Sequence, residues 1–301
     1  MPTTFTQNGG ERLLMSERTA SSGDYGAWIG RTERCNDDIT AWPLAAYAAT
    51  LDRDDPTPQP GDPLPPGAHW LYFLPASRQS ELGPDGHARR GGFLPPVVLP
   101  RRMWAGGRLF FYDAPRVGDR AERVSTIKNV RTREGRSGRL CLVLVEHRIS
   151  TARGLAIVEE HDIVYRDAPG AALTSAAAPQ GVPPGVALWQ RTIVPDDVLL
   201  FRYSALTFNG HRIHYDRNYA TLVEGYPGLV VHGPLQATLL LDLVRRERPE
   251  ASLREFAFRA LAPIFDTAPF TLNGRPAGAA SVELWTAGPA GSPAVSATAA
   301  W

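Results

Sequence analysis

GLVVHGPLQATLLLDLVRRERP, residues 228–249, is the stretch that decides the fold of this chain. Pro234 can occupy the first turn of a helix, where its missing N–H costs nothing, and Pro249 ends that helix. The leucines and valines between the two prolines cover more than one face, so we expect a buried helix about 20 Å long, at about 1.5 Å per residue. Arg245 and Arg246 lie near its C-terminal end, where the helix dipole favours cations. The sequence therefore predicts a central helix that other elements enclose.

Segments typical of antiparallel strands precede and follow this helix. Residues 108–166 alternate apolar and polar side chains in runs separated by turn signals, and residues 253–288 contain three further runs. In the first half, residues 37–52 have helical spacing, and residues 69–74 stand where the second half has its apolar helix. The second half thus repeats the first in outline, which predicts an α+β fold with a sheet wrapped around a helix twice over.

Composition divides the chain further. Residues 1–24 are a polar lead-in, residues 25–167 form the first repeat, and residues 168–188 are an Ala-, Pro- and Gly-rich linker. Residues 189–288 form the second repeat. We expect residues 289–301, which are rich in Ala, Ser and Pro, to be a frayed tail.

The overall composition excludes several classes of protein. Of 301 residues, 43% are hydrophobic and 21% are charged, which is typical of a soluble globular chain. The net charge of +1 gives no field that would attract nucleic acid or an anionic membrane. Cys35 and Cys141 are far apart, and no stretch resembles a signal peptide or a membrane span, so we expect a cytoplasmic protein without disulfides. Motifs of P-loop NTPases, serine hydrolases and zinc proteases are missing from the sequence.

Groups that can do chemistry are densest in residues 201–220, FRYSALTFNGHRIHYDRNYA, which contain two histidines and three arginines. Histidine, with an ordinary pKa near about 6.5, can take a proton from water at neutral pH. An asparagine cannot titrate, although its side-chain oxygen can hold and position a water molecule. This segment and the HGP that precedes the central helix are therefore the predicted site.

The same segment resembles the active-site motif of the MaoC-like (R)-specific hydratases, also called hydratase 2. His214 falls on the catalytic histidine of that family, and Asn209 on its aspartate position five residues earlier. The form TFNxHRIHYD is similar to a subgroup that contains the mesaconyl-CoA and itaconyl-CoA hydratases and the hydroxyacyl-thioester dehydratases of type 2. Residues 82–107, LGPDGHARRGGFLPPVVLPRRMWAGG, resemble the first repeat of that subgroup, so that the likeness covers roughly residues 25–285.

The resemblance implies a double hotdog fold and a cofactor-independent hydro-lyase without a metal. Its expected substrate is a C5-dicarboxylyl-CoA such as itaconyl-CoA or mesaconyl-CoA, which would be hydrated to citramalyl-CoA. The alternatives are a 3-hydroxyacyl-thioester dehydratase of fatty-acid metabolism and a non-catalytic acyl-CoA-binding hotdog protein with Asn209 as the lesion. A hotdog thioesterase would need a carboxylate against the thioester carbon, which residues 209–214 do not offer. A homodimer is common in the family.

Three residues are the predicted catalytic groups: His214 as the base, Asn209 as the residue that positions water, and Gly233. The Gly233 amide would hold the enolate oxygen at the N-terminus of the central helix, where one such donor contributes about 10²- to 10³-fold. The predicted substrate-binding residues are Arg101, Arg102, Trp104, Tyr203, His211, Arg212 and His232.

Several of these roles stay open in the sequence. His211 is equally well a structural residue, and His232 more readily fixes the start of the helix than contacts substrate. Arg101, Arg102 and Arg108 are either ordinary surface charges or candidates for the substrate carboxylate, and Arg212 is another candidate. The EEHD run at residues 159–162 is interpreted as a solvated strand and not as a metal site, because strand alternation puts its side chains on opposite faces.

Overall fold

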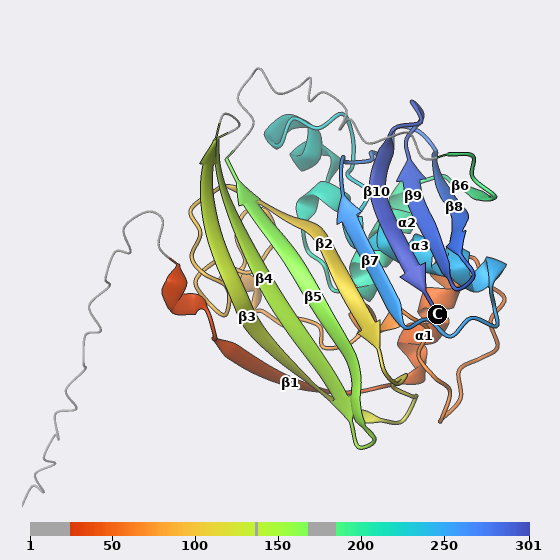
Figure 1. The fold of residues 1–301 in the computed structure, drawn as a ribbon. Helices are drawn as coiled ribbons and strands as arrows, with labels where there is room; N and C mark the ends of the chain where they lie inside the picture. Colours follow the sequence, from red (N-terminus) through yellow and green to blue (C-terminus); the bar gives the residue numbers. More distant parts are fainter. Residues whose placement is uncertain (1–24, 136–137, 168–184) are drawn as a thin grey trace, which may run out of the picture.

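The predicted buried helix is α3, which spans Gly233–Glu247. All ten residues Leu235–Val244 are buried, including the polar Gln236, Thr238 and Asp242. A helix that is buried all round must be enclosed by other elements. Figure 1 shows α3 behind the second-half strands, with α2 beside it.

The computed structural model describes residues 25–135, 138–167 and 185–301. Their strands form one ten-stranded antiparallel sheet in the order β1-β3-β4-β5-β2-β7-β10-β9-β8-β6 (Figure 1). The predicted lead-in, residues 1–24, and most of the predicted linker, residues 168–188, lie outside the described residues.

The first repeat contains five strands and one α-helix. Their bounds are β1 Thr32–Asp38, α1 Ala41–Thr50, β2 Arg101–Phe111, β3 Arg120–Gly135, β4 Gly138–Thr151 and β5 Gly154–Arg166. The second repeat has β6 Trp189–Ile193, α2 Asp197–Leu206, α3, β7 Glu255–Ala260, β8 Phe270–Gly278, β9 Ser281–Ala287 and β10 Pro293–Ala300.

The two halves have the same strand order, counted from the outer edge inward: first, third, fourth, fifth and second strand of each repeat. They meet where β2 pairs with β7, with Gly107 opposite Phe258. A side chain at Gly106 would lie 2.5 Å from the Phe258 carbonyl oxygen, so glycine is required for this close approach. The predicted repeat and antiparallel sheet are therefore confirmed.

The prediction of a central helix in both repeats is wrong for the first. The HWLYFL segment forms only a short 3₁₀ turn, Ala68–Leu71, followed by extended chain. A space on the inner face of β3, β4 and β5 therefore stays open instead of holding a helix, and polar side chains line it. This difference gives the molecule its large cavity.

Two further expectations are corrected. The first strand, β1, was missed because its sequence, TERCNDD, is polar; it is an edge strand with mostly exposed side chains. Residues 289–301 are not a frayed tail, because β10 lies between β7 and β9. Its small residues Ala297 and Ala299 are buried, and small side chains let α3 pack closely against the strand. Composition alone hid a central strand.

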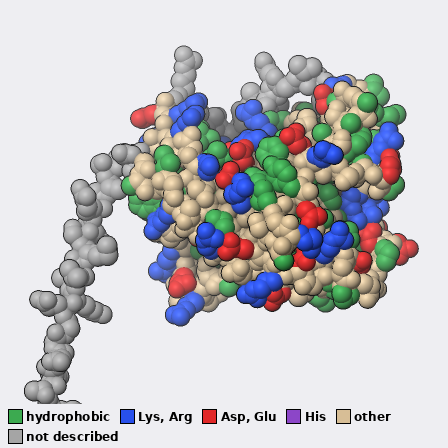
Figure 2. Space-filling model, turned by 60° about the horizontal axis from the view of Figure 1, so that its bottom comes forward, with side chains coloured by type: hydrophobic (Ala, Val, Ile, Leu, Met, Phe, Trp, Pro, Cys, Tyr) green, Lys and Arg blue, Asp and Glu red, His purple; other side chains and the backbone are tan. Residues whose placement is uncertain are grey.

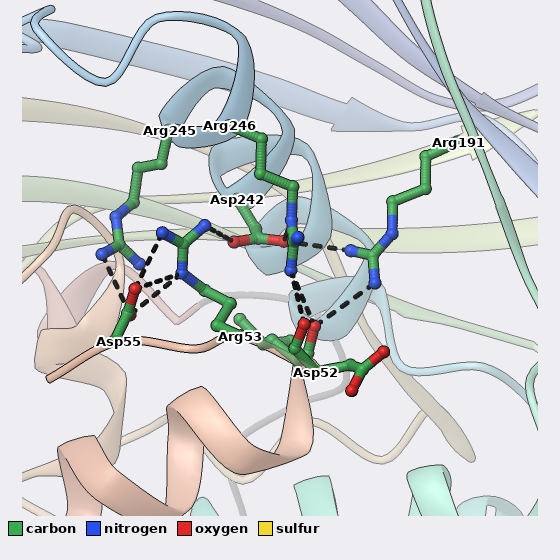
Figure 3. A network of polar contacts seen from close by, with 8 residues as sticks. Asp52, Arg53, Asp55, Arg191, Asp242, Arg245 and Arg246 are labelled. Atoms are coloured by element: carbon green, nitrogen blue, oxygen red, sulfur yellow. Dashed lines mark hydrogen bonds and ion pairs between the residues drawn. The ribbon is translucent and has the colours of Figure 1, made fainter. Parts of the chain in front are cut away.

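The C-terminal end of α3 is tied to both repeats by a buried ion-pair network (Figure 3). Asp242, whose side chain has no exposed surface, accepts hydrogen bonds from Arg53 (2.8 Å), Arg191 (3.0 Å) and Arg246 (2.7 Å). Arg53 follows α1 and Arg191 lies on β6. Of the two cations predicted to favour the helix dipole, Arg246 thus also binds this buried carboxylate, whereas Arg245 pairs with Asp55.

The outer surface carries mixed charges. Figure 2 shows basic and acidic side chains interspersed over the visible face, in agreement with the net charge of +1. Among the described residues, no helix is long and apolar enough to span a bilayer.

Candidate active site

A cavity of about 2390 Å³ is lined by residues of both repeats. From the second repeat it is bordered by Asn209, His214 and Gly233, three residues that the sequence singles out. Its volume exceeds the roughly 300–1,000 Å³ of common small-molecule pockets, so a ligand as long as a CoA thioester can enter. The predicted catalytic residues are thus brought to one cavity.

His214 ends a 3₁₀ turn, Arg212–His214, and is 7% exposed. Its Nδ1 lies 2.7 Å from the Val230 carbonyl oxygen, which can only accept a hydrogen bond. Nδ1 therefore carries the proton, and Nε2 is left with a free lone pair. Burial lowers the pKa of His214 to about 4, although the bond to Val230 acts in the opposite direction. The residue is a neutral imidazole with a proton-accepting nitrogen.

His232 packs against one face of the His214 ring. The two rings stack with centroids 3.7 Å apart, and His232 has no exposed surface. Its Nε2 is 2.8 Å from the Ser204 hydroxyl on α2. Burial holds the pKa of His232 well below its ordinary value, so this ring is neutral as well. The geometry favours the structural alternative for His232, since the ring packs under the base instead of reaching the cavity.

Tyr203 has a similar place in the core. It is 1% exposed, and its hydroxyl lies 3.1 Å from the Thr238 hydroxyl on α3. The ring is also 5.1 Å from that of His232, edge to face. Although Tyr203 borders the cavity, its polar atom joins α2 to α3. Its predicted contact with substrate stays a prediction.

Asn209 shapes the loop that carries the histidines. Its side-chain oxygen accepts a hydrogen bond from the His211 backbone N–H at 3.0 Å, an Asx turn. The preceding residue, Phe208, has a φ of 47°, which places it in the left-handed region. The oxygen that was predicted to hold water is thus already engaged in the turn. Asn209 borders the cavity, but its clearest role is to set the direction of the loop.

Gly233 begins α3 at the edge of the cavity. The preceding residue, His232, forms no side-chain cap, which leaves the first amides of the helix available to a ligand. A side chain at Gly233 would have the Trp104 carbonyl oxygen as its nearest neighbour, 3.9 Å away. The protein itself therefore leaves room there, and the space in front of this amide can take a thioester oxygen.

Trp104 joins this point to the first repeat. Its ring packs at 4.2 Å from His161 and at 5.3 Å from Trp70, and it borders the cavity as predicted.

The three arginines among the predicted substrate-binding residues have different partners in the structure. Arg101 pairs with Glu224 (3.4 Å) and bonds the backbone oxygen of the same residue (2.9 Å). Arg212 pairs with Asp216 at 2.7 Å. Arg102 borders the cavity, and of the residues that the structure describes none forms an ion pair with it. Burial is the main cause of the lowered pKa values of His161 and His211, and the positive charge of Arg102 adds to it, so Arg102 is the arginine placed to meet an anion in the cavity.

The sequence interpretation missed two residues of the first repeat, Asp85 and His87, which lie beside His211. The Asp85 carboxylate, His87 and His211 have donor atoms within 4.8 Å of one another, a spacing that could hold a metal ion. Asp85 already accepts a hydrogen bond from His87 Nδ1 at 3.0 Å, which accounts for the arrangement without a metal. Burial lowers the pKa of His211 to about 2, so this ring is neutral. The PDGH letters within the long loop were the signal, because long ordered loops are often functional.

The EEHD run of β5 is not a solvated strand. Strand alternation does separate its side chains: Glu160 and Asp162 pair with Arg108 on the outer face. On the inner face, however, Glu159 is 4% exposed and lies 3.0 Å from both His69 Nε2 and Trp70 Nε1.

Burial opposes the ionisation of Glu159, but the bond from His69 and the neighbouring histidines outweigh it and lower its pKa to about 2. Burial also lowers the pKa values of His147 and His161, to about 3 and about 4. This inner face borders the cavity because the first repeat has no central helix to cover it.

Comparisons with known proteins agree with this geometry. The family model "Hydroxyacyl-thioester dehydratase type 2" matches residues 67–266. An enzyme of Chloroflexus aurantiacus named "Mesaconyl-C(4)-CoA hydratase" is 51% identical over 278 residues, 92% of this chain and 98% of that protein.

Solved structures of lower identity share the fold. HtdX of Mycobacterium tuberculosis superposes with a TM-score of 0.62 at 20% identity, covering 89% of this chain and 99% of that one. A second protein of the same organism, described as a double hotdog fold, has a TM-score of 0.54 at 14% identity, with 90% and 96% covered. The predicted double hotdog is thereby confirmed. The chain belongs to the hydroxyacyl-thioester dehydratase type 2 family, within the MaoC-like hydratases, and is a hydro-lyase.

Proposed function

We propose that this protein adds water to the double bond of a C5-dicarboxylyl-CoA, mesaconyl-CoA or itaconyl-CoA, to give citramalyl-CoA. The observation that carries the proposal is the placement of His214 Nε2, a proton acceptor, and the uncapped N-terminus of α3 on one cavity. The 51% identity to a protein named as a mesaconyl-C(4)-CoA hydratase supports the substrate class and favours mesaconyl-CoA over itaconyl-CoA.

In the proposed reaction on mesaconyl-CoA, whose double bond is conjugated with the thioester as that of itaconyl-CoA is not, His214 Nε2 takes a proton from water while the water oxygen bonds to the β-carbon of the enoyl group. The electrons of the double bond move toward the thioester, whose oxygen takes up negative charge at the Gly233 amide. Return of the proton to the α-carbon completes the addition and restores neutral His214. A general base of this kind contributes about 10²- to 10⁴-fold, and an oxyanion donor about 10²- to 10³-fold.

Arg102 is the residue that we assign to the free carboxylate of the substrate. It is the one of the three predicted arginines that the described residues leave without an anionic partner, and it borders the cavity. A guanidinium can bind a carboxylate with two parallel hydrogen bonds, which a saturated acyl chain would not require.

The test is a panel of thioesters: mesaconyl-CoA, itaconyl-CoA and crotonyl-CoA, which lacks the second carboxylate. A mass gain of about 18 units on mesaconyl-CoA is the expected result, whereas release of free CoA would indicate a thioesterase. An Arg102→Gln variant should raise KM for mesaconyl-CoA by about 10- to 100-fold, which is the loss of one charge-assisted interaction, and leave crotonyl-CoA unaffected. Arg101→Gln, which removes an arginine already paired with Glu224, is the matched control.

A second candidate is a 3-hydroxyacyl-thioester dehydratase of fatty-acid metabolism, which the description of the matching family favours. The same His214 and Gly233 would catalyse the reverse reaction on an unbranched chain. Faster turnover of crotonyl-CoA than of mesaconyl-CoA, unaffected by Arg102→Gln, would favour that candidate. Binding without turnover would favour a non-catalytic acyl-CoA-binding protein.

A further inference from the structure

A loop of the first repeat, residues 84–87, contacts the catalytic loop of the second repeat, residues 209–214. The Arg212 backbone N–H donates to the Asp85 carbonyl oxygen at 2.9 Å, and its guanidinium donates to the Pro84 carbonyl oxygen at 3.0 Å. Gly86 has a φ of 89°, and a side chain there would lie 1.8 Å from the Gly210 carbonyl oxygen. Only glycine permits this approach, so the sequence holds the two loops in direct contact. Arg212, which was predicted to bind substrate, forms the two hydrogen bonds that hold this loop in place.

The contact brings a carboxylate–imidazole pair to the active site. Asp85 Oδ2 lies 3.0 Å from His87 Nδ1, and Asp85 Oδ1 also accepts the His87 backbone N–H at 3.1 Å. These bonds outweigh burial and lower the pKa of Asp85, so the carboxylate is ionised and can only accept. Burial outweighs the bond to Asp85 and lowers the pKa of His87, so the ring is neutral: Nδ1, which faces the carboxylate, carries its one proton and Nε2 is left as a free acceptor.

His87 is close to the residues that the reaction uses. Its ring centroid lies 4.1 Å from that of His211, which is in turn 5.3 Å from that of His214. His87 and His214 both border the cavity, and His87 contributes, after burial, to the lowered pKa of His214. The His87 side chain is 22% exposed, so a water molecule can reach its free nitrogen.

The catalytic loop lacks one group that the reaction needs. Water has two hydrogens, and a second acceptor beside His214 would fix the direction of the water oxygen toward the β-carbon. His214 Nε2 takes one. The Asn209 oxygen is engaged by the His211 amide, and among His211, His214 and His232 none has a described carboxylate within hydrogen-bond distance.

Resting on the hydratase activity proposed above, we propose that His87 Nε2 accepts the second hydrogen of the catalytic water and that Asp85 positions His87 for it. The first repeat thus contributes a catalytic residue, and the pair performs the task that the resemblance to the MaoC-like motif implies for an aspartate at position 209. Asp85 acts through His87: it fixes which nitrogen carries the proton, and the ring orientation.

The test compares kcat and KM for His87→Leu, His87→Gln and Asp85→Asn on crotonyl-CoA and mesaconyl-CoA, after dialysis against a chelator. His87→Leu should lower kcat by about 100-fold with little change in KM, because the lost interaction acts on water and not on the thioester. The amide oxygen of His87→Gln can still accept a hydrogen bond, so kcat of this variant should be at least about 10-fold higher than that of His87→Leu. Asp85→Asn can turn the ring to the wrong tautomer and should lower kcat by about 10- to 100-fold. Arg89→Gln, an exposed cation of the same loop, is the control and should match the wild type.

Three results would overturn the assignment of His87. They are a wild-type kcat in His87→Leu, equal losses in the Leu and Gln variants, or activity that requires an added divalent cation, since Asp85, His87 and His211 would then be metal ligands. Absence of hydration by the wild-type protein on every thioester would overturn the proposed function itself, and His87 with it.

Discussion

At the scale of single residues, Asn209 places an amide where the resemblance to the MaoC-like motif implies an acid. Asn209 holds the turn through its bond to the His211 amide, so this position contributes shape instead of proton transfer. The base, His214, has its tautomer fixed by the Val230 carbonyl. Replacement of His214 by alanine should therefore remove activity, whereas Asn209→Asp tests whether a titrating dyad can be restored in this loop.

Gly233 allows a cleaner test, because the protein leaves space around it. An added methyl group would meet only the Trp104 carbonyl oxygen, at 3.9 Å, an ordinary contact. Gly233→Ala should therefore fold with an unchanged melting temperature, while kcat falls at least about 10-fold because the methyl group keeps the thioester oxygen from the helix N-terminus. Calorimetry and hydration kinetics on the same preparation measure both. A variant with full kcat would show that the enolate is stabilised elsewhere.

Much of the site was predictable at this scale, and the limit has a physical cause. Motif spacing located His214, Asn209 and Gly233, because they are close in sequence or stand at a recognisable helix start. Asp85 and His87 lie more than a hundred residues earlier, and the close contact of Gly86 with Gly210 and the hydrogen bonds from Arg212 bring them to the site. Strand alternation separated the side chains of β5 correctly, but it could not show that one face is buried.

At the scale of elements, α3 is held by its apolar side chains and by Asp242. Two prolines and a run of leucines made this helix predictable in its bounds and its burial. The partners of Asp242 were not predictable, since Arg53 and Arg191 lie 189 and 51 residues from it in the sequence (Figure 3).

Asp242→Asn should destabilise the protein by about 3 kcal/mol, because removal of one member of a buried ion-pair network leaves the remaining charges unpaired. The denaturant midpoint, with an unchanged slope, measures the loss. Glu122→Gln removes an exposed pair with Arg34 and should cost no more than about 0.5 kcal/mol. Equal effects of the two substitutions would contradict the structural role assigned to the network.

At the scale of the whole molecule, one repeat keeps the central helix and the other gives up that volume to the cavity. The strand order of the two repeats is the same, and this symmetry was visible in the sequence only as an order of elements. The absence of a central helix from the first repeat was not visible in the sequence, because HWLYFL is as apolar as a helix would be. Association of two chains and a cytoplasmic location stay predictions from the sequence.

Both repeats bury histidines beside the cavity, which predicts how stability depends on pH. Burial lowers the pKa values of His147, His161 and His214 to between about 3 and about 4, below the ordinary value of about 6.5. Between these values the unfolded chain binds protons that the folded chain excludes, so their contribution is complete above about pH 6.5 and is lost as the pH falls toward about 4.

Melting temperatures from about pH 8 to about pH 4.5 should therefore be steady at first and then fall. His147→Gln can keep a hydrogen bond to Ser125 and should reduce the number of protons taken up on unfolding by about one, so its free energy of unfolding should fall less steeply with pH. A melting temperature that is independent of pH across this window would contradict the neutral state of these rings.

The central claim is that His214 activates water for addition to an enoyl thioester. Its most direct test is to incubate the wild type and His214→Gln with mesaconyl-CoA in water enriched in oxygen-18 and to follow the product by mass. The account predicts an intact CoA thioester that has gained one heavy oxygen, formed at least about 100-fold more slowly by the variant. Free CoA with the heavy oxygen in the released acid, or equal rates for the two proteins, would contradict it.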